Sequence, residues 1–420
     1  NISIKIAICK SSNLQTIKDD FSKLISFIEV EELELLFILS HINKKILLYS
    51  FALKAISQNS FEKYIDKFLE ELISFSIDLR TSDIHIEQYK ELVLFKFRID
   101  GRLKTFFAFK NEFFKLISSY IKLISNLDIM QIRIPQDGRF SLNIENKKYD
   151  FRVSSMPTLE AESIVLRILD NKNINKNLKT LGLSENLLEI LNQTLKLTQG
   201  LILISGPTGS GKTTTLYSIL QELNCEEKKI ITVEDPIEYK IDSICQIPIN
   251  SKIGLSFELV LKNILRQDPD IIFIGEIRDK FSLDIALQAS LTGHLVIASI
   301  HANSAVETIL RLVDLQADPF LISSTLKLVM AQRLVLNYCK FCGAVGCTKC
   351  NYTKYYDRST IAEVLKVDEK ISSMIFKKSD INELKTYLEN INFKTILDDG
   401  KQKVEQNQTS LDEVYKVACF

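Results

Sequence analysis

The sequence has no excess of charge of either sign and no long apolar run. Lysine plus arginine number 53, aspartate plus glutamate also number 53, and the formal net charge is zero. This balance gives no support for a nucleic-acid partner or an anionic membrane surface as the binding target. No apolar run approaches the ~20 residues of a membrane-spanning helix, and the most apolar early segment, Leu33–Ser40, is short and contains a glutamate. No secretory signal is visible, so we expect a cytoplasmic protein that docks at a membrane through another protein.

The rest of the composition is ordinary for a folded protein. Apolar residues make up 46% and charged residues 25% of the 420 positions, which is enough for sizeable cores. A chain of this length predicts two or three domains. We find no internal repeat.

Three zones and a linker are predicted along the chain. Residues 1–62 form a small N-terminal region, and residues 63–170 mix helical and strand patterns in an α+β domain. The stretch 171–180 is rich in asparagine and lysine, which is linker composition. Residues 181–420 alternate strands and helices, which predicts an α/β fold with a parallel sheet covered on both faces.

Individual elements follow from the periodicity of apolar residues. In the α+β domain we predict helices at 63–79 and 113–127 and strands at 92–99, 150–154 and 164–169. In the last zone we predict strands at 201–205, 230–234, 271–276 and 295–300, with a helix at 257–265.

Residues 200–215 have the pattern of a phosphate-binding loop. An apolar strand leads into G-x-x-x-x-G-K-[ST], and an amphipathic helix follows. The glycines allow backbone N–H groups to turn inward, Lys212 can reach the β- and γ-phosphates, and the Thr213 hydroxyl would bind Mg²⁺. The sequence therefore predicts that the chain binds ATP and Mg²⁺. The predicted binding residues are Gly206, Pro207, Thr208, Gly209, Ser210, Gly211, Lys212, Thr213 and Thr214.

Acidic residues and histidines stand where predicted strands end near this loop. Glu276 ends one strand and is the candidate for polarising the attacking water or for holding Mg²⁺ through water. Glu234 ends another strand and is followed by Asp235, so a second carboxylate could orient the water or the metal. His301 is placed to sense the γ-phosphate by a hydrogen bond, whereas for His294 a purely structural role is equally open.

Arginines are the usual side chains that stabilise the charge of phosphoryl transfer. Arg266 and Arg278 bracket the strand that ends at Glu276. The α+β domain offers six more, several of which lie inside apolar strands, where a guanidinium without a partner would be costly. That partner can be a carboxylate of the same domain or a nucleotide. These arginines are Arg98, Arg102, Arg133, Arg139, Arg152 and Arg167.

The eight cysteines fall into two groups. A long chain without an export signal argues against disulfides, so the four scattered cysteines are interpreted as buried small residues or free thiols. The other four form two Cys-x-x-Cys pairs at Cys339, Cys342, Cys347 and Cys350. Four thiolates and no open position predict a structural Zn²⁺ site, with a redox pair or an iron–sulfur cluster as the alternatives.

These motifs together resemble the ATPases of type II secretion, type IV pilus assembly and DNA uptake in competence. The resemblance covers about residues 80–365. Its motifs, in chain order, are Ser82–Glu87, Phe97–Arg102, Pro135–Arg139, Phe151–Ser154, Ile231–Tyr239, Leu265–Asp279 and Leu291–Asn303.

The resemblance implies a RecA-like P-loop motor domain, a preceding α+β, PAS-like domain and a small zinc-binding subdomain with four cysteines inserted at 339–350. It also implies a homohexamer, peripheral at the inner membrane, whose ATP hydrolysis displaces a membrane platform protein, with a membrane-docking protein as a further partner and no direct contact with nucleic acid. Arg152 and Arg167 match the family's nucleotide-contacting arginines in position. Glu234, Glu276, Arg278 and His301 complete the predicted catalytic set.

The chain departs from the family pattern at several places. Ala161 precedes Glu162 where the family has Gly-Glu, and Lys262 stands where arginine is frequent, which weakens that position as a bidentate clamp. The loop between the cysteine pairs is shortened. The N-terminal region is small, so we expect a large docking domain to be missing.

Three alternative functions remain open from the sequence. A retraction-type pilus motor would lack the four-cysteine site. A nucleic-acid translocase on the same core is opposed by the zero net charge and by the absence of a basic-aromatic stripe. A nucleotide-binding scaffold without turnover is opposed by Glu276 and the arginines. Which filament or cargo an assembly motor serves is invisible in the sequence.

Overall fold

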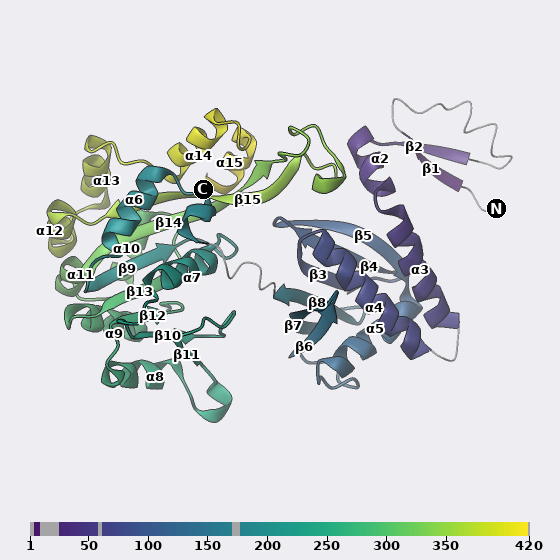
Figure 1. The fold of residues 1–420 in the computed structure, drawn as a ribbon, viewed down its shortest axis with the longest axis horizontal. Helices are drawn as coiled ribbons and strands as arrows, with labels where there is room; N and C mark the ends of the chain where they lie inside the picture. Colours follow the sequence, from purple (N-terminus) through teal and green to yellow (C-terminus); the bar gives the residue numbers. More distant parts are fainter. Residues whose placement is uncertain (1–3, 9–24, 58–60, 170–176, 419–420) are drawn as a thin grey trace. The chain divides into compact units, whose positions relative to one another are not determined.

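The structure is a computed structural model, and it describes residues 4–8, 25–57, 61–169 and 177–418 (Figure 1). Its contacts divide the chain into two compact units. The first unit comprises residues 1–170 and 338–357, and the second comprises 171–337 and 358–420. The separate N-terminal region predicted at 1–62 and the linker at 171–180 stay predictions, and residues 171–176 lie outside the described part.

The first unit is built on a six-stranded antiparallel sheet with the order β5-β4-β3-β8-β7-β6. The predicted helices at 63–79 and 113–127 are α4 and α5, and the predicted strand at 92–99 is β4 with the same bounds. The elements are α4 (Phe61–Asp78), β3 (Thr81–Gln88), β4 (Leu92–Ile99), β5 (Arg102–Lys110), α5 (Asn111–Ile124), β6 (Gln136–Ile144), β7 (Lys147–Pro157) and β8 (Glu162–Leu169).

Helices cover one face of this sheet. The buried side chains of the strands, among them Ile84, Phe95 and Phe97, belong to one core with Phe68 of α4 and Phe113 of α5. Alternation along each strand places every second residue on the opposite face, so polar and charged residues gather there. This second face carries four of the predicted arginines, Arg98, Arg139, Arg152 and Arg167.

Two parallel strands and two helices precede α4. They are β1 (Ile4–Ile8), β2 (Ile25–Glu29), α2 (Glu32–Leu39) and α3 (Ile42–Ser57). Helix α3 exposes Ile42, Ile46, Tyr49, Leu53 and Ile56. Among the described residues no single helix is long and apolar enough to cross a membrane, whereas α2 and α3, bent by 51° against each other, pass that test as a pair by length and composition alone.

The second unit contains a seven-stranded sheet with the order β11-β10-β12-β13-β9-β14-β15. Strands β11, β10, β12, β13, β9 and β14 pair in parallel, as the alternation of strands and helices predicted. The strands are β9 (Gly200–Ser205), β10 (Ile230–Glu234), β11 (Cys245–Pro248), β12 (Ile271–Ile274), β13 (Leu295–Ile300), β14 (Leu326–Tyr338) and β15 (Tyr355–Lys366).

Both faces of this sheet are covered by helices (Figure 1). Alternate residues of β9 enter different cores: Leu201 and Leu203 pack with one set of helices, and Ile202 and Ile204 with the other. The first set is α8 (Phe257–Ile264), α9 (Lys280–Leu291), α10 (Ala305–Asp314), α11 (Pro319–Thr325), α12 (Glu369–Lys377) and α13 (Ile381–Asn390). The second set is α6 (Glu185–Thr194) and α7 (Lys212–Leu223).

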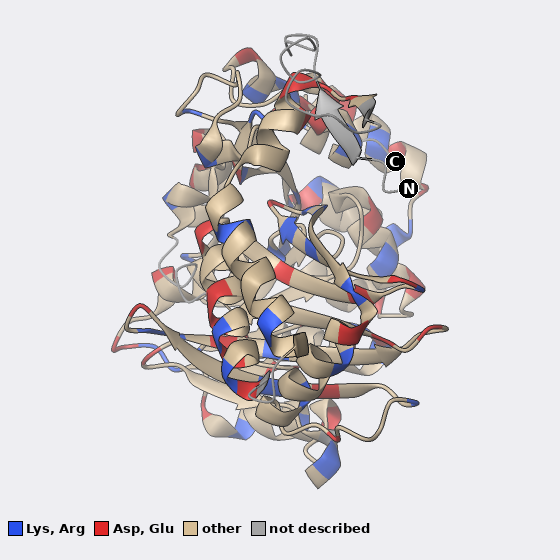
Figure 2. Cartoon of the chain, turned by 90° about the vertical axis from the view of Figure 1, so that its right-hand side faces the viewer, with Lys and Arg blue, Asp and Glu red and all other residues tan. Residues whose placement is uncertain are grey.

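The last two described helices are α14 (Ile396–Glu405) and α15 (Leu411–Ala418). Ile396 and Val414 from these helices form a small core with Ala331 and Val335 of β14 and Ile361 of β15. Lysine, arginine, aspartate and glutamate are interspersed over the elements visible in Figure 2, in keeping with the zero net charge.

Candidate active site

The phosphate-binding loop lies between the fully buried strand β9 and helix α7, as predicted. Gly206 has a φ of 148°, and a Cβ there would lie 2.7 Å from the carbonyl oxygen of Gln332. Only glycine tolerates both the conformation and the close approach of β14. The loop ends at Gly211, which has a φ of 89° and precedes the first residue of α7. Its backbone N–H groups and those of the helix N-terminus form an anion site.

Lys212 begins helix α7 and folds back over the loop. Its ammonium donates hydrogen bonds to the carbonyl oxygens of Gly206 at 2.7 Å and Pro207 at 3.1 Å. Burial lowers the pKa of Lys212, the Glu276 carboxylate opposes this shift, and the Arg333 guanidinium adds to it. Lys212, Glu276 and Arg333 therefore share one electrostatic environment.

The hydroxyl groups of the loop have distinct surroundings. Thr208 and Thr213 are exposed, and Thr214 is half-buried. The Ser210 side chain is buried, and the Ser210 carbonyl oxygen accepts a hydrogen bond from Gln332 Nε2 at 2.9 Å. The loop is thus fixed to strand β14 while Thr213 faces solvent at the start of α7.

Glu276 lies two residues beyond β12, which ends at Ile274 and is shorter than the predicted strand 271–276. One carboxylate oxygen is 2.7 Å from Arg278 Nε, and the other is 2.9 Å from His301 Nε2. His301 follows directly after β13, the neighbour of β12 in the sheet. The structure thus brings together three of the predicted catalytic residues, all at the carboxyl edge of parallel strands.

Glu234 ends β10, next to β12, but its carboxylate is buried. It accepts hydrogen bonds from Tyr217, from Thr232 Oγ1 at 2.6 Å and from Gln246 Nε2 at 3.2 Å. Burial raises the pKa of Tyr217, and the adjacent Glu234 carboxylate adds to this shift. Glu234 therefore connects helix α7 to strands β10 and β11.

Arg333 on β14 is a charged residue of this site that our sequence reasoning missed. Its side chain is buried and donates to the carbonyl oxygens of Gln332 and Asn303, both at 2.9 Å. An arginine inside the apolar run of residues 326–336 was the available signal, because a buried guanidinium requires partners. Burial lowers the pKa of Arg333, and Glu363 and Glu307 oppose that shift.

A cavity of about 410 Å³ opens beside the loop. Its lining includes Pro207 of the loop, His301 and Asn303 after β13, and Glu307 and Arg311 of α10. Glu307 accepts a hydrogen bond from the backbone N–H of Asn303 at 3.0 Å. The segment that carries His301 is therefore held from both sides, by Arg333 and by Glu307.

Two other residues discussed from the sequence have local partners. His294 Nδ1 lies 3.0 Å from the carbonyl oxygen of Ala289 and 3.3 Å from Thr292 Oγ1, the structural environment weighed above for this histidine. Arg266 hydrogen-bonds the side chain of Asn263.

Four of the six predicted arginines of the first unit lie in one row across the sheet. Arg102 stands opposite Ile99, which packs against the core, and Arg133 lies between α5 and β6. Strand register places Arg139 opposite Arg152, Arg152 opposite Arg167, Arg167 opposite Asp83, and Asp83 opposite Arg98. Directly opposed residues share a face, so four guanidinium groups and one carboxylate line the open face. Arg167 Nε is 2.8 Å from Asp83 Oδ1, and the Arg167 side chain is 60% exposed.

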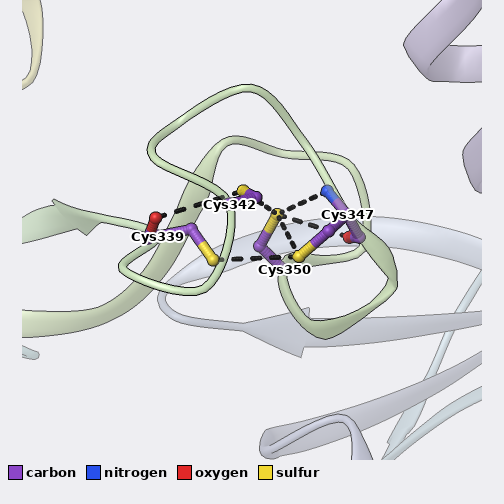
Figure 3. Close-up of side chains that lie close together, drawn as sticks. All are labelled: Cys339, Cys342, Cys347 and Cys350. Atoms are coloured by element: carbon purple, nitrogen blue, oxygen red, sulfur yellow. Dashed lines mark hydrogen bonds between the residues drawn. The ribbon is translucent and has the colours of Figure 1, made fainter.

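The four clustered cysteines converge on one point (Figure 3). All four sulfur atoms lie within 4.8 Å of one another. The Sγ atoms of Cys339 and Cys347 are 4.0 Å apart, those of Cys342 and Cys350 are 3.9 Å apart, and those of Cys347 and Cys350 are 3.8 Å apart. Two of the scattered cysteines, Cys225 and Cys245, are exposed free thiols, and the other two lie outside the described residues.

Comparison with known proteins agrees with this site. The family model described as "Type II/IV secretion system protein" matches residues 57–416. The type II secretion system ATPase E of Vibrio cholerae serotype O1 is 40% identical over 378 residues, which cover 84% of this chain and 75% of that protein. The same identity and coverage are found for the type II secretion system protein E of Aeromonas hydrophila.

A solved structure of a pilus motor is also similar to this chain. The pilus retraction motor PilT with bound ADP aligns with a TM-score of 0.59 and 27% identity, covering 84% of this chain and 97% of that one.

Proposed function

The chain belongs to the type II/IV secretion system protein family and is an ATPase of a secretion or pilus motor, and we propose that it uses Glu276 to activate the attacking water and drives an inner-membrane platform protein as a homohexamer. The predicted family, α/β fold and ATPase activity are confirmed by these comparisons. Glu276 carries the proposal for the mechanism, because its carboxylate lies between Arg278 and His301 and interacts electrostatically with the lysine of the phosphate-binding loop.

ATP would bind with its phosphates on the loop 206–211 and the N-terminus of α7. The Lys212 ammonium would exchange its present carbonyl partners for phosphate oxygens, which are stronger acceptors. Arg278 and His301 orient the Glu276 carboxylate toward a water molecule in line with the γ-phosphate. Glu276 accepts hydrogen bonds from that water and thereby polarises it.

Mg²⁺ fits the oxygen-rich side of this loop. The exposed hydroxyl of Thr213 and the partly open carboxylate of Glu276 are the hard oxygen donors that Mg²⁺ prefers. When bound with ATP, the ion would neutralise charge on the β- and γ-phosphates. Thr213 would hold the ion, and Glu276 would supply a further oxygen donor on its side of the loop.

Zn²⁺ fits the cysteine cluster. A tetrahedron with Zn–S bonds of ~2.3 Å has edges of ~3.8 Å between its sulfur atoms, and the Sγ pairs lie 3.8, 3.9 and 4.0 Å apart. Four protein ligands leave no open position, so the metal would supply structure and no chemistry at the nucleotide. The small spread of the sulfurs favours a single ion over the alternatives of a redox pair or an iron–sulfur cluster.

The arginine row of the first unit supports a second contact with the nucleotide. Four guanidinium groups face one carboxylate, Asp83, so the row has an excess of positive charge suited to phosphate oxygens. Arg152 and Arg167, at its centre, would contact the nucleotide held by the second unit of the same or another chain. If the nucleotide belongs to another chain, this contact would make assembly of the hexamer depend on bound ATP.

The proposed partner and location rest on the family resemblance. Relatives named as type II secretion system proteins support the proposal that the chain acts at the inner membrane from the cytoplasmic side. There it would act on a platform protein, with a membrane-docking protein as a second partner, in secretion, pilus extension or DNA uptake.

The substitution Glu276→Gln tests the mechanism. It preserves the shape of the side chain and removes its negative charge, so ATP hydrolysis should fall by about 100-fold or more. ATP should still raise the melting temperature of the variant, because the loop and Lys212 are intact. Glu258→Gln on α8 is the matched control, since Glu258 is exposed and paired with Lys262 on the same helix. Hydrolysis by Glu276→Gln at the parent rate would show that Glu276 does not activate water.

The same variant tests the hexamer. Glu276→Gln should hold ATP without turnover, and its mass in solution with Mg²⁺ and ATP should reach six times the 48.1 kDa of one chain. A monomeric mass at micromolar protein and saturating ATP would contradict the hexamer.

A further inference from the structure

The cysteine segment, residues 338–357, makes its contacts within the first unit, although both of its ends continue into strands of the second unit. Residues 338–357 lie between β14 and β15, whose longer parts belong to the second unit. The contacts of the segment nevertheless group it with residues 1–170. The cysteine loop can therefore act on the first unit, and its contacts there show on which elements.

The first contact is with helices α2 and α3. Asn351 follows directly after Cys350, is 4% exposed and has a φ of 50°. Its Oδ1 atom lies 3.3 Å from Nε2 of His41, the residue directly before α3. The His41 ring also contacts the buried Phe75 of α4, with 5.3 Å between ring centroids. The residue next to a cysteine ligand is thus connected through one histidine to the core of the first unit.

A second contact reaches α2 itself. Gly346, next to Cys347, packs so closely on Leu33 that a Cβ on the glycine would lie 2.9 Å from Leu33 Cδ2. Gly346 also donates its backbone N–H to the sulfur of Cys342 at 3.3 Å. Gly346 therefore contacts both the sulfur atom of Cys342 and helix α2.

A third set of contacts lies where the segment leaves the cysteine loop. The Arg80 guanidinium stacks on the Tyr356 ring at 3.6 Å and bonds Asp100 at 2.8 Å. Asp100 in turn accepts the backbone N–H of Asp357 at 3.3 Å. Arg102 lies over the Tyr355 ring at 5.3 Å. These contacts hold the turn between β4 and β5.

The cysteine loop is held together mainly by backbone hydrogen bonds and has little apolar core of its own. Phe341 and Val345 are 65% and 71% exposed, so the loop buries few apolar side chains of its own. Several residues without glycine's freedom have positive φ, among them Ala344 and Tyr352, and such conformations persist only when the surroundings fix them. Bonds from four thiolates to one ion supply that fixation, and metal binding is then coupled to local folding.

We propose that the cysteine loop is a metal-dependent clasp that holds helices α2 and α3 and the β4–β5 turn in place within the first unit. The proposal rests on the proposed Zn²⁺ site and adds a role for it. Metal binding fixes Gly346 and Asn351, and these two residues fix Leu33 and His41. Metal loss therefore loosens helices that carry no cysteine ligand.

Hydrogen exchange on the full chain tests this proposal. The Zn²⁺-loaded protein is compared with the same protein after chelation under reducing conditions, with metal content measured in both samples. Amides of residues 32–46 and of the β4–β5 turn should exchange about tenfold faster or more after chelation, while α5 stays protected. Faster exchange confined to residues 338–357 would overturn the clasp.

The substitution Asn351→Ala separates the clasp from the metal site. It leaves all four thiolates in place, so the variant should keep its Zn²⁺ while residues 38–46 lose protection. Asn407→Ala is the matched control, because Asn407 also has a positive φ of 54° and follows helix α14 in the second unit. Unchanged protection at 38–46 in Asn351→Ala that retains Zn²⁺ would overturn the proposal. A parent protein without Zn²⁺ would instead refute the metal site itself.

Linkage provides a reciprocal test. If metal binding stabilises α2 against the loop, contacts from α2 must stabilise bound metal by the same factor. Leu33→Asp should therefore bind Zn²⁺ several-fold more weakly than the parent in equilibrium competition with a colorimetric chelator, although residue 33 is far from the cysteines in sequence. Equal equilibrium affinities for Leu33→Asp and the parent would count against the clasp.

Discussion

Glu234 and Glu276 end neighbouring parallel strands, yet their surroundings suit them to different tasks. Glu276 has its carboxylate partly open to solvent between Arg278 and His301. Glu234 is 4% exposed and receives three hydrogen bonds from Tyr217, Thr232 and Gln246. Because Glu234 is buried among three protein donors, whereas the Glu276 side chain is 23% exposed, water reaches Glu234 less easily. We therefore expect Glu234 to position helix α7 and its predicted catalytic role to be indirect.

The substitution Tyr217→Phe tests this interpretation. It removes one donor to a buried carboxylate without changing the packing, so the free energy of unfolding should fall by about 1–3 kcal/mol. Tyr415→Phe on α15 is the control, since Tyr415 is 43% exposed and an exposed substitution should change stability by less than about 0.5 kcal/mol. Both are measured by denaturant unfolding. Equal stability of Tyr217→Phe and the parent would mean that the network contributes nothing.

At the scale of elements, one carboxylate of β15 joins two helices. Glu363 is buried and accepts the backbone N–H groups of Ala305 at 2.5 Å and Ile396 at 3.1 Å. These are the first residues of α10 and α14. Each unpaired N–H at a helix start needs an acceptor, and a negative charge there also favours the helix dipole. Burial raises the pKa of Glu363, whereas the two backbone hydrogen bonds and Arg333 oppose the shift.

We expect Glu363→Ala to destabilise the protein by about 3 kcal/mol or more, because each hydrogen bond to a charged group contributes about 1.5–3 kcal/mol. The control is Asp318→Ala, which removes the exposed cap of one helix, α11, and should cost about 1 kcal/mol. Thermal and denaturant unfolding both report the difference. If Glu363→Ala and Asp318→Ala lower the free energy of unfolding equally, Glu363 does not stabilise two helices.

The sequence predicted some elements better than others for a physical reason. Strand β4 and helix α4 have a clean period of two or of 3.6 residues, and they were found within two residues of their true ends. The long strand β14 was not predicted, because a nearly continuous apolar run has no period that separates a strand from a helix. Only its pairing with β9 in the sheet makes it a strand.

At the scale of the whole molecule, the arginine row would link the first unit to the function of the second. A single register error in the antiparallel sheet would move an arginine to the opposite face, so the row depends on the pairing of five strands. The row has four arginines for one nucleotide. We expect Arg152 and Arg167, near its centre, to contribute more to ATP hydrolysis than Arg98 and Arg139 at its ends.

We therefore expect Arg152→Ala and Arg167→Ala each to reduce ATP hydrolysis by about 1,000-fold or more, because arginines that stabilise phosphoryl transfer contribute about 10³–10⁵-fold. Lys148→Ala is the matched control, since Lys148 lies on the same strand as Arg152 and its side chain is 67% exposed. Steady-state hydrolysis with normal circular dichroism spectra provides the measurement. Parent-like rates in both arginine variants would remove the row from the nucleotide site.

The sequence by itself determined the chemistry that depends on near neighbours in the chain. The loop 206–213, the carboxylate after β12 and the paired cysteines were found because glycine conformation, strand ends and ligand spacing are local properties. Only the tertiary structure decided what lies across the sheets. It showed the protein donors around Glu234, the burial of Arg333 against Asn303, and the contact of Asn351 with His41. These pairs are far apart in the chain or set by strand register, and no local pattern encodes the packing that brings them together.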